Sequence, residues 1–259
     1  MHPEIRHQVI SDSYKSDMLF LETDLIFFQR NDQRKVLSNE LDAFPRLWSL
    51  GIAEVTPDLI GVHRHGETLR KSGLWAAFIP PFSLINWEIA PSPFRWKAYL
   101  SHSELPSDLP EEPILFPWND LWQPKTKAEI FEKVRSIKNY IHIGKEESLN
   151  STAIQTREYI NKNFQSPKKF AEIANELNFS HSIMARSFKK SYGLSPIAYR
   201  NKLRVFESLT HLLFSQNTVV DTGQLVGFGD TSRFNKQFRN QLNAVPSQFI
   251  PKKKHGKST

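Results

Sequence analysis

Two histidines and a carboxylate near residue 65 have the spacing of a metal site. His63 and His65 flank a single residue, and Glu67 follows two positions later. On a β-strand these three side chains would share one face, because side chains alternate with a period of two. Neutral imidazoles and carboxylates bind divalent transition metals. The stretch therefore raises the hypothesis of a metal-dependent enzyme, which the rest of the chain has to support.

The composition excludes several other kinds of chemistry. The 259 residues contain no cysteine, which excludes disulfides, thiolate catalysis, iron–sulfur clusters and zinc sites built from cysteine. The first 15 residues lack the apolar core of a signal peptide, and the longest apolar run, residues 73–87, is too short and too proline-broken to span a bilayer. We therefore expect a cytoplasmic protein without a membrane segment.

Charge is distributed unevenly along the chain. Residues 1–118 carry 11 Lys and Arg against 16 Asp and Glu, a net charge of −5. Residues 119–148 are nearly neutral at +1, whereas residues 149–259 carry 17 basic against 6 acidic side chains, a net charge of +11. One strongly basic third is expected where only one domain meets a polyanion, although a solvated basic surface needs no partner.

The acidic first part has the pattern of a β-domain. Short apolar runs alternate with turn residues, and in residues 94–100 every second side chain, from Phe94 to Leu100, is apolar. This spacing predicts an antiparallel sandwich or barrel. All six tryptophans precede residue 123. We expect most of them in the core, while an aromatic-lined barrel would also enclose a small ligand.

A connector follows a proline-rich stretch that ends near residue 125. Ile130, Val134, Ile137 and Ile141 have helical spacing and predict one helix over residues 126–143. Its apolar stripe either packs on its own sheet or pairs with a second subunit, and the sequence leaves both open. The acidic, polar residues 144–151 are typical of a linker.

The basic third contains a duplicated unit. Its matching residues are Met184 and Phe234, Phe188 and Phe238, Pro196 and Pro246, and Tyr199 and Phe249, each 50 positions apart, and Ala174 and Gly223, Asn178 and Gly227, and Phe179 and Phe228, each 49 apart. A one-residue difference in a turn explains the shift. Each unit is predicted to be an amphipathic helix, a tight turn and a second helix with polar or basic outward residues, as a major-groove reader requires. Between the units, Ser195 and Pro196 predict the start of a spacer helix.

Through residues 152–250 the chain resembles the AraC/XylS family of transcription regulators. The matching segments are AEIANELNFSHSIMARSFKKSYGLSPIAYRNKLR and GFGDTSRFNKQFRNQLNAVPSQF. The resemblance implies a seven-helix DNA-binding domain whose two recognition helices enter successive major grooves, roughly 34 Å apart. Thr222 and Gly223 depart from the usual branched residue and alanine, and a mid-helix glycine costs about 1 kcal/mol relative to alanine.

The resemblance also assigns residues to DNA. The expected base-reading residues are Ser182, Ala185 and Arg186 in the first unit and Thr231, Ser232, Arg233 and Lys236 in the second. Arg186 has the side chain best suited to bidentate guanine reading. Phosphate contacts or simple solvation are expected for His181, Lys189, Lys190 and Arg239.

In this family the variable domain often resembles a cupin barrel, so the histidines can be compared with the metal-cupin pattern. Only Val62 separates Gly61 from His63, which compresses the first motif, and Asn86 occupies the place of the last histidine in the second. Asparagine is a poor zinc or iron ligand, so we predict no metal and no cofactor. The remaining candidates for contact with an effector are His63, His65, Trp75, Trp87 and Trp96.

The sequence thus predicts an α+β protein: a cupin-like β-barrel or sandwich at 1–122 for effector sensing or dimerisation, a connector helix and linker at 123–148, and an all-α, seven-helix domain at 149–259 with two helix-turn-helix motifs. The predicted function is a sequence-specific DNA-binding transcriptional regulator, an activator rather than an enzyme, with no catalytic residues. Its predicted partners are double-stranded DNA, RNA polymerase, a small effector and a second subunit. Two alternatives are a metal-dependent cupin enzyme with a basic localisation module and an architectural DNA binder without a ligand.

Overall fold

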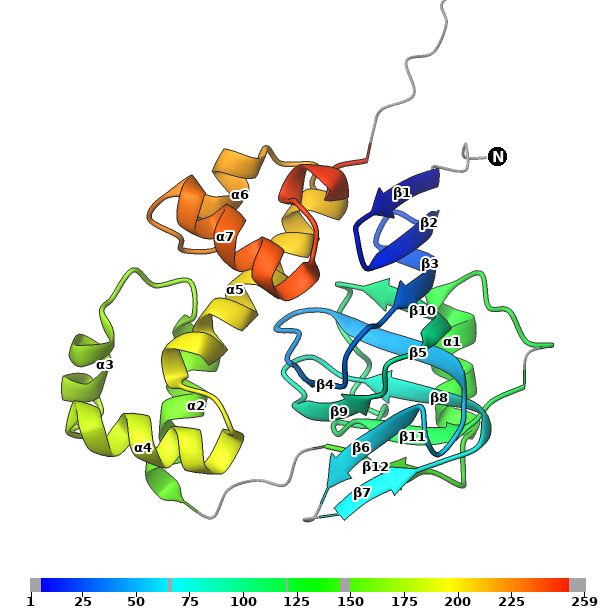
Figure 1. Ribbon diagram of the computed structural model, residues 1–259, viewed down its shortest axis with the longest axis horizontal. Coiled ribbons are helices and arrows are strands. Elements are labelled where there is room, and N and C mark those ends of the chain that lie inside the picture. The colour runs from blue at the N-terminus through cyan, green and yellow to red at the C-terminus, as the bar shows by residue number, and fades with distance from the viewer. Residues whose placement is uncertain (1–5, 65–66, 120, 145–149, 252–259) are drawn as a thin grey trace, which may run out of the picture.

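A β-rich part and a helical part make up the protein, in that order along the chain (Figure 1). The computed structural model describes residues 6–64, 67–119, 121–144 and 150–251. None of the helices in these ranges combines the length and the apolar character needed to cross a membrane. The predicted α+β class, with a sheet-rich first part and helical second part, is confirmed.

The β-rich part consists of two antiparallel sheets. The larger has eight strands, in the spatial order β1 (Arg6–Ile10), β2 (Tyr14–Glu22), β3 (Leu25–Gln33), β10 (Pro93–Ser101), β5 (Trp48–Val55), β8 (Gly73–Ile79), β11 (Ile114–Pro117) and β12 (Ile141–His142). The smaller has the order β4 (Ser38–Asp42), β9 (Ile85–Ile89), β6 (Ile60–Arg64) and β7 (Glu67–Arg70). Among the described strands no hydrogen-bonded ladder joins the two sheets, so the arrangement is a sandwich rather than a closed barrel.

Helix α1 (Lys127–Ser136) corrects the prediction of one helix over 126–143. It begins at the N-cap Thr126 and ends before Ile137, whose backbone is extended. Residues Ile141–His142 then pair with β11 as strand β12. Ile130 and Val134 are 0% and 3% exposed and belong to one core cluster with residues of the larger sheet. The apolar stripe therefore packs on its own sheet.

Residues 150–251 of the helical part form seven helical elements: α2 (Ser151–Asn163), α3 (Phe170–Glu176), α4 (His181–Tyr192), α5 (Pro196–Leu213), α6 (Val219–Leu225), α7 (Thr231–Leu242) and the 3-10 helix η1 (Pro246–Phe249). The duplicated unit corresponds to α3–α4 and α6–α7, joined by α5 (Figure 1). At the matching turns Asn178 and Gly227 both have positive φ, 56° and 90°. Ser195 caps α5, and Pro196 is its first residue, as the sequence predicts.

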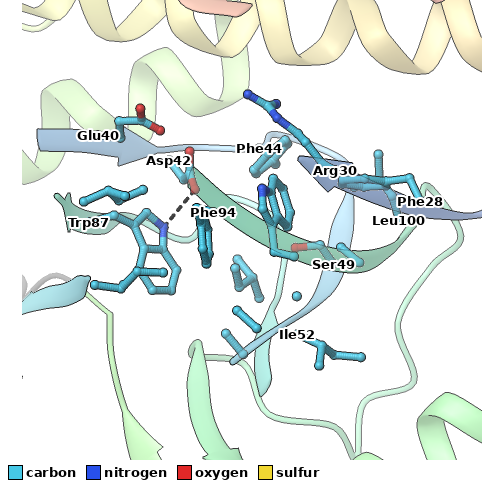
Figure 2. Close-up of a pocket in the computed structure, with 18 of the residues that line it drawn as sticks. Phe28, Arg30, Glu40, Asp42, Phe44, Ser49, Ile52, Trp87, Phe94 and Leu100 are labelled. Carbon is cyan, nitrogen blue, oxygen red and sulfur yellow. Dashed lines mark hydrogen bonds between the residues drawn. The ribbon is translucent and has the colours of Figure 1, made fainter. Parts of the chain in front are cut away.

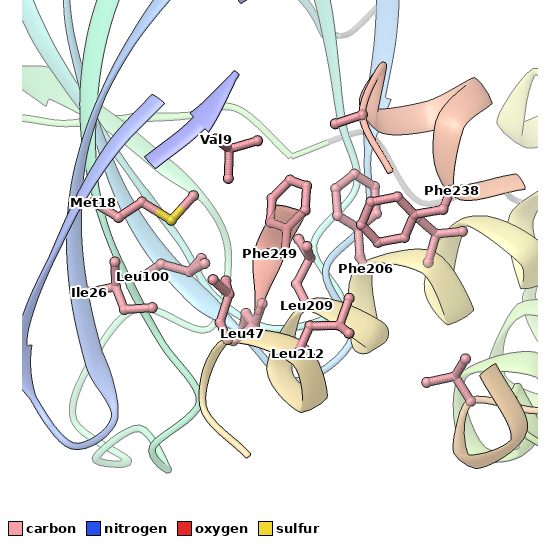
Figure 3. Packing of buried hydrophobic residues seen from close by; sticks show 14 of the residues in the cluster. Val9, Met18, Ile26, Leu47, Leu100, Phe206, Leu209, Leu212, Phe238 and Phe249 are labelled. Atoms are coloured by element: carbon pink, nitrogen blue, oxygen red, sulfur yellow. The ribbon is translucent and has the colours of Figure 1, made fainter. Parts of the chain in front are cut away.

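The second unit lies against the larger sheet (Figure 3). One buried hydrophobic cluster contains Val9 and Met18 from the strands together with Phe206 from α5 and Phe249 from η1. The His7 ring Nε2 donates to the backbone carbonyl oxygen of Gln248 (2.6 Å). The two parts thus share a hydrophobic core rather than being joined only by a linker.

Candidate functional site

Helix α4 presents the first set of predicted base-reading residues. The Ser180 side chain caps its N-terminus by accepting from the backbone N–H of Ile183 (3.3 Å). Met184 and Phe188 are fully buried, so the helix has one fixed outward face. Ser182 and Arg186 are exposed on it, whereas Ala185 is half-buried. The arrangement leaves the guanidinium of Arg186 accessible to a partner.

Helix α7 repeats this construction. The carboxylate of Asp230 accepts from the backbone N–H of Arg233 (2.6 Å) and caps the helix. Phe234 and Phe238 are fully buried. As a result, the predicted base-reading residues Ser232, Arg233 and Lys236 are exposed, and Thr231 is half-buried.

The four residues predicted to contact phosphate are all exposed, but two have neighbours that qualify this role. His181 packs edge-on against the ring of Phe170, with ring centroids 5.0 Å apart. Arg239 borders a groove of about 1240 Å³ between α7 and the β-rich part. Lys189 and Lys190 occupy the last turn of α4, where basic side chains also favour the helix dipole.

Ile183 is an outward residue of α4 that sequence reasoning missed. Its side chain is 53% exposed although it is large and apolar. It follows Ser182, and the buried positions 184 and 188 require that it point away from the core. The helical spacing of the apolar positions 184 and 188 could have shown in the sequence that Ile183 faces outward. An exposed isoleucine at this place matches the methyl group that thymine presents in the major groove.

A cavity of about 240 Å³ lies inside the β-sandwich and reaches the helices (Figure 2). The apolar face predicted for residues 94–100 forms part of its wall, together with residues of both sheets. The helical part closes one side with five apolar residues: Phe206, Leu209, Leu213, Leu242 and Phe249. A molecule in this cavity would therefore touch the β-rich part and the second helix-turn-helix unit at once.

The three tryptophans predicted to contact an effector all line this cavity. Trp87 Nε1 donates to Asp42 (2.8 Å), and Trp96 Nε1 donates to Asp32 (2.6 Å). Trp75 Nε1 donates to a backbone carbonyl oxygen, that of Ser72 (3.0 Å). With their polar atoms engaged in this way, the indole rings contribute apolar surface.

Ionic side chains gather where the cavity meets α5. Arg34 hydrogen-bonds Glu40, and although burial alone would raise the pKa of Glu40, this bond and the arginine charge lower it. Burial raises the pKa of Asp42 to about 6, against the lowering effect of the Lys202 charge. Burial also lowers the pKa of Lys202, against Asp42 and Glu40. The helical and β-rich parts thus share a titratable cluster.

Asp42→Asn is expected to gain stability relative to the natural protein as pH rises from about 4 to about 8. The folded-state pKa of Asp42, about 6, lies above its ordinary 3.8, so the folded state holds the proton more tightly. The stabilisation that the natural protein gains from this proton is complete below the unfolded-state pKa of Asp42, 3.8, and is lost as the pH rises through about 6. The difference between the two free energies of unfolding should shift by about 2 kcal/mol in favour of the variant.

Urea denaturation across this pH range measures that difference. Asp58→Asn, which removes the same carboxylate from an exposed position, is the matched control for the change of charge alone. A difference for Asp42→Asn that varies with pH no more than the difference for this control would contradict the prediction.

The side chain of His63 is not part of the cavity wall. Its ring has protein neighbours on both nitrogens: Thr68 Oγ1 lies 2.7 Å from Nδ1, and Glu88 lies 3.5 Å from Nε2. Glu67 is exposed at the start of β7. His65, the other histidine predicted to contact an effector, is outside the described residues. In the described ranges no three His, Asp or Glu side chains are grouped to hold a metal.

Comparisons with known proteins point to one family. A family profile described as a helix-turn-helix domain matches residues 173–251. The transcriptional activator RhaS of Yersinia pestis (strain Pestoides F) is 26% identical over 92 residues, which are 36% of this chain and 34% of RhaS. The chain thus matches about a third of the length of this curated relative.

The fold of nearly the whole chain is similar to that of one solved protein, ToxT. ToxT from Vibrio cholerae, solved at 1.65 Å, aligns with a TM-score of 0.50 at 12% identity, over 87% of this chain and 97% of ToxT. A second structure of ToxT, from strain SCE256 and described as bound to an unsaturated fatty acid, aligns with the same TM-score at 14% identity, over 88% and 95% of the two chains. These similarities confirm the predicted resemblance of the duplicated helix-turn-helix region to the AraC/XylS family of transcriptional regulators.

Proposed function

We propose that the protein is a sequence-specific transcriptional regulator that reads DNA with α4 and α7. The observation that carries the proposal is the pair of capped helices, each anchored by two buried aromatic or methionine side chains and each presenting exposed polar and basic residues. The net charge of +11 over residues 149–259 favours a polyanionic partner. Arg186, Arg233 and Lys236 are the side chains proposed for base contacts.

We further propose that a small effector controls this activity from the cavity. Support comes from the wall that α5, α7 and η1 contribute to the cavity, because a ligand there would alter the packing of the second unit. ToxT, which shares the fold, has been solved with an unsaturated fatty acid. Largely apolar cavities with few polar groups are typical of small-molecule sites.

Activation and assembly are further parts of the proposal. RhaS is named as an activator, and by analogy this protein would bind beside RNA polymerase at a promoter. The β-rich part is proposed as the dimerisation surface. Helix α1 is a weaker choice, since its apolar residues Ile130 and Val134 are already buried against the larger sheet.

Arg186→Ala is expected to weaken binding to the cognate DNA site by about 1–3 kcal/mol, roughly 5- to 150-fold, because a bidentate base contact is lost. Binding to random DNA should change little. A genome-wide binding map would supply the cognate site, and fluorescence anisotropy at fixed salt would measure both affinities.

The matched control is Arg95→Ala, which removes the same charge from an exposed position on β10. It should leave both affinities nearly unchanged. Equal losses on cognate and random DNA for Arg186→Ala would make Arg186 a phosphate contact. A binding map without enriched, motif-bearing sites would contradict sequence-specific regulation.

A further inference from the structure

Two buried hydroxyl groups in the cavity wall have no hydrogen-bond partner among the described residues. They belong to Tyr14 and Ser16, which are 5% and 2% exposed. Both residues point inward from β2, two positions apart on the same strand face. Leaving such groups unpaired in the interior is unfavourable. A ligand that hydrogen-bonds them would remove this cost.

The cations next to these hydroxyls are already neutralised. Arg30 donates from Nε and Nη2 to one oxygen of Asp32 (3.1 and 2.9 Å), and its guanidinium lies 3.6 Å from the centroid of the Tyr14 ring. Arg34 hydrogen-bonds Glu40 and Ser38. Arg34 Nε has no hydrogen-bond partner among the described residues, but the two guanidiniums already face two carboxylates, Asp32 and Glu40. An incoming carboxylate would therefore add a third negative charge to this group.

One other cation borders the cavity. Lys71 lies in the turn between β7 and β8, is partly exposed, and has its ammonium 5.2 Å from the centroid of the Trp75 ring. Tyr14 and Ser16 belong to β2, and three strands, β3, β10 and β5, separate β2 from β8 in the larger sheet, so Lys71 lies at a different part of the cavity wall. A carboxylate placed beside the hydroxyls would be buried without a cation of its own, which is costly.

We propose that the cavity binds a largely apolar molecule with an uncharged hydroxyl, amide or ester head group hydrogen-bonded by Tyr14 and Ser16, and that it discriminates against the corresponding carboxylate. The inference rests on the proposed effector control and names the chemical class of the effector. The Tyr14 phenol supplies a donor and an acceptor, and the Ser16 hydroxyl does the same. The apolar walls take the remainder of the molecule.

A matched pair of probes tests this assignment: decan-1-ol and decanoate, titrated into the full chain and followed by tryptophan fluorescence, because Trp87 and Trp96 line the cavity. Decan-1-ol is expected to bind at least about tenfold more tightly than decanoate. The double variant Tyr14→Phe, Ser16→Ala should lose about tenfold in decan-1-ol affinity while decanoate changes little. Lys71→Met should leave decan-1-ol binding unchanged.

The outcomes separate this inference from the proposed function. Decanoate binding as tightly as decan-1-ol, or decanoate binding lost in Lys71→Met, would overturn the head-group assignment but leave effector control standing. If neither probe binds, the head-group assignment is overturned as well. Binding to the cognate DNA site, measured separately, then tests the proposed DNA-binding function independently of any effector. Thermal unfolding of each variant verifies that it is folded, and the single variants Tyr14→Phe and Ser16→Ala replace the double variant if it is not.

Discussion

Replacing Gly227 with alanine is expected to destabilise the helical part by about 3 kcal/mol. Gly227 has φ +90°, which L side chains rarely adopt, and an added Cβ would lie 2.1 Å from the backbone carbonyl oxygen of Gln165. The left-handed conformation costs about 1–2 kcal/mol and overpacking about 1–3 kcal/mol. A carbonyl of the main chain cannot rotate away, so the loop after α2 would have to separate from the turn after α6.

Two spectroscopic signals can follow this change in urea denaturation. All six tryptophans precede residue 123, so their fluorescence reports on the β-rich part, while far-UV circular dichroism is dominated by the helices. Gly229→Ala is the matched control, since a Cβ at Gly229 meets no atom within 4 Å. Its free energy of unfolding should change by less than about 0.5 kcal/mol. Equal effects of the two substitutions would contradict the steric argument.

The sequence was sufficient for the helix-turn-helix units because their determinants are local. Met184 and Phe188, four positions apart in the predicted amphipathic helix, are both 0% exposed. Asn243 follows the second recognition helix in the left-handed conformation, which asparagine adopts more readily than most other residues. Gly223 was interpreted only as a weakness of its helix. The structure adds a packing reason, since a Cβ there would lie 3.1 Å from the ring of Phe234.

The cavity and the interface depend on contacts far apart in the sequence. Alternation along residues 94–100 identified one apolar face, but only the pairing of β10 with β3 and β5 places that face in a cavity. On β2, the sequence pattern did not indicate that the hydroxyl of Ser16 would be buried without a hydrogen-bond partner. The end of α1 was missed for a similar reason: Ile141 continues the helical spacing, yet pairing with Leu115 of β11 determines its conformation.

Contacts between residues far apart in the sequence also form the junction between the two helix-turn-helix units. Arg204, on α5, is 4% exposed and donates to two main-chain carbonyl oxygens of the loop after α2: Nε to Phe164 (2.6 Å) and Nη2 to Ser166 (2.6 Å). Its guanidinium also lies 5.6 Å from the centroid of the Phe228 ring, in the turn after α6. Arg204 therefore links the loop that leads into the first unit to the turn of the second, next to Gly227. Reading two successive major grooves requires a constant separation between the two units.

Arg204→Met is expected to lower the free energy of unfolding of the helical part by about 3 kcal/mol, because two carbonyl oxygens lose a charged donor and hydrogen bonds to charged groups contribute about 1.5–3 kcal/mol each. Burial first, and then the charges of Arg200 and Arg233, lower the pKa of Arg204 to about 10, so it remains a cation at neutral pH. Arg200→Met is the matched control, since Arg200 makes one such bond, to the carbonyl oxygen of Lys168 (2.7 Å). Urea denaturation followed by circular dichroism should give roughly half the loss for Arg200→Met. Equal losses, or a loss below about 1 kcal/mol for Arg204→Met, would show that the junction is held by apolar packing rather than by the arginine.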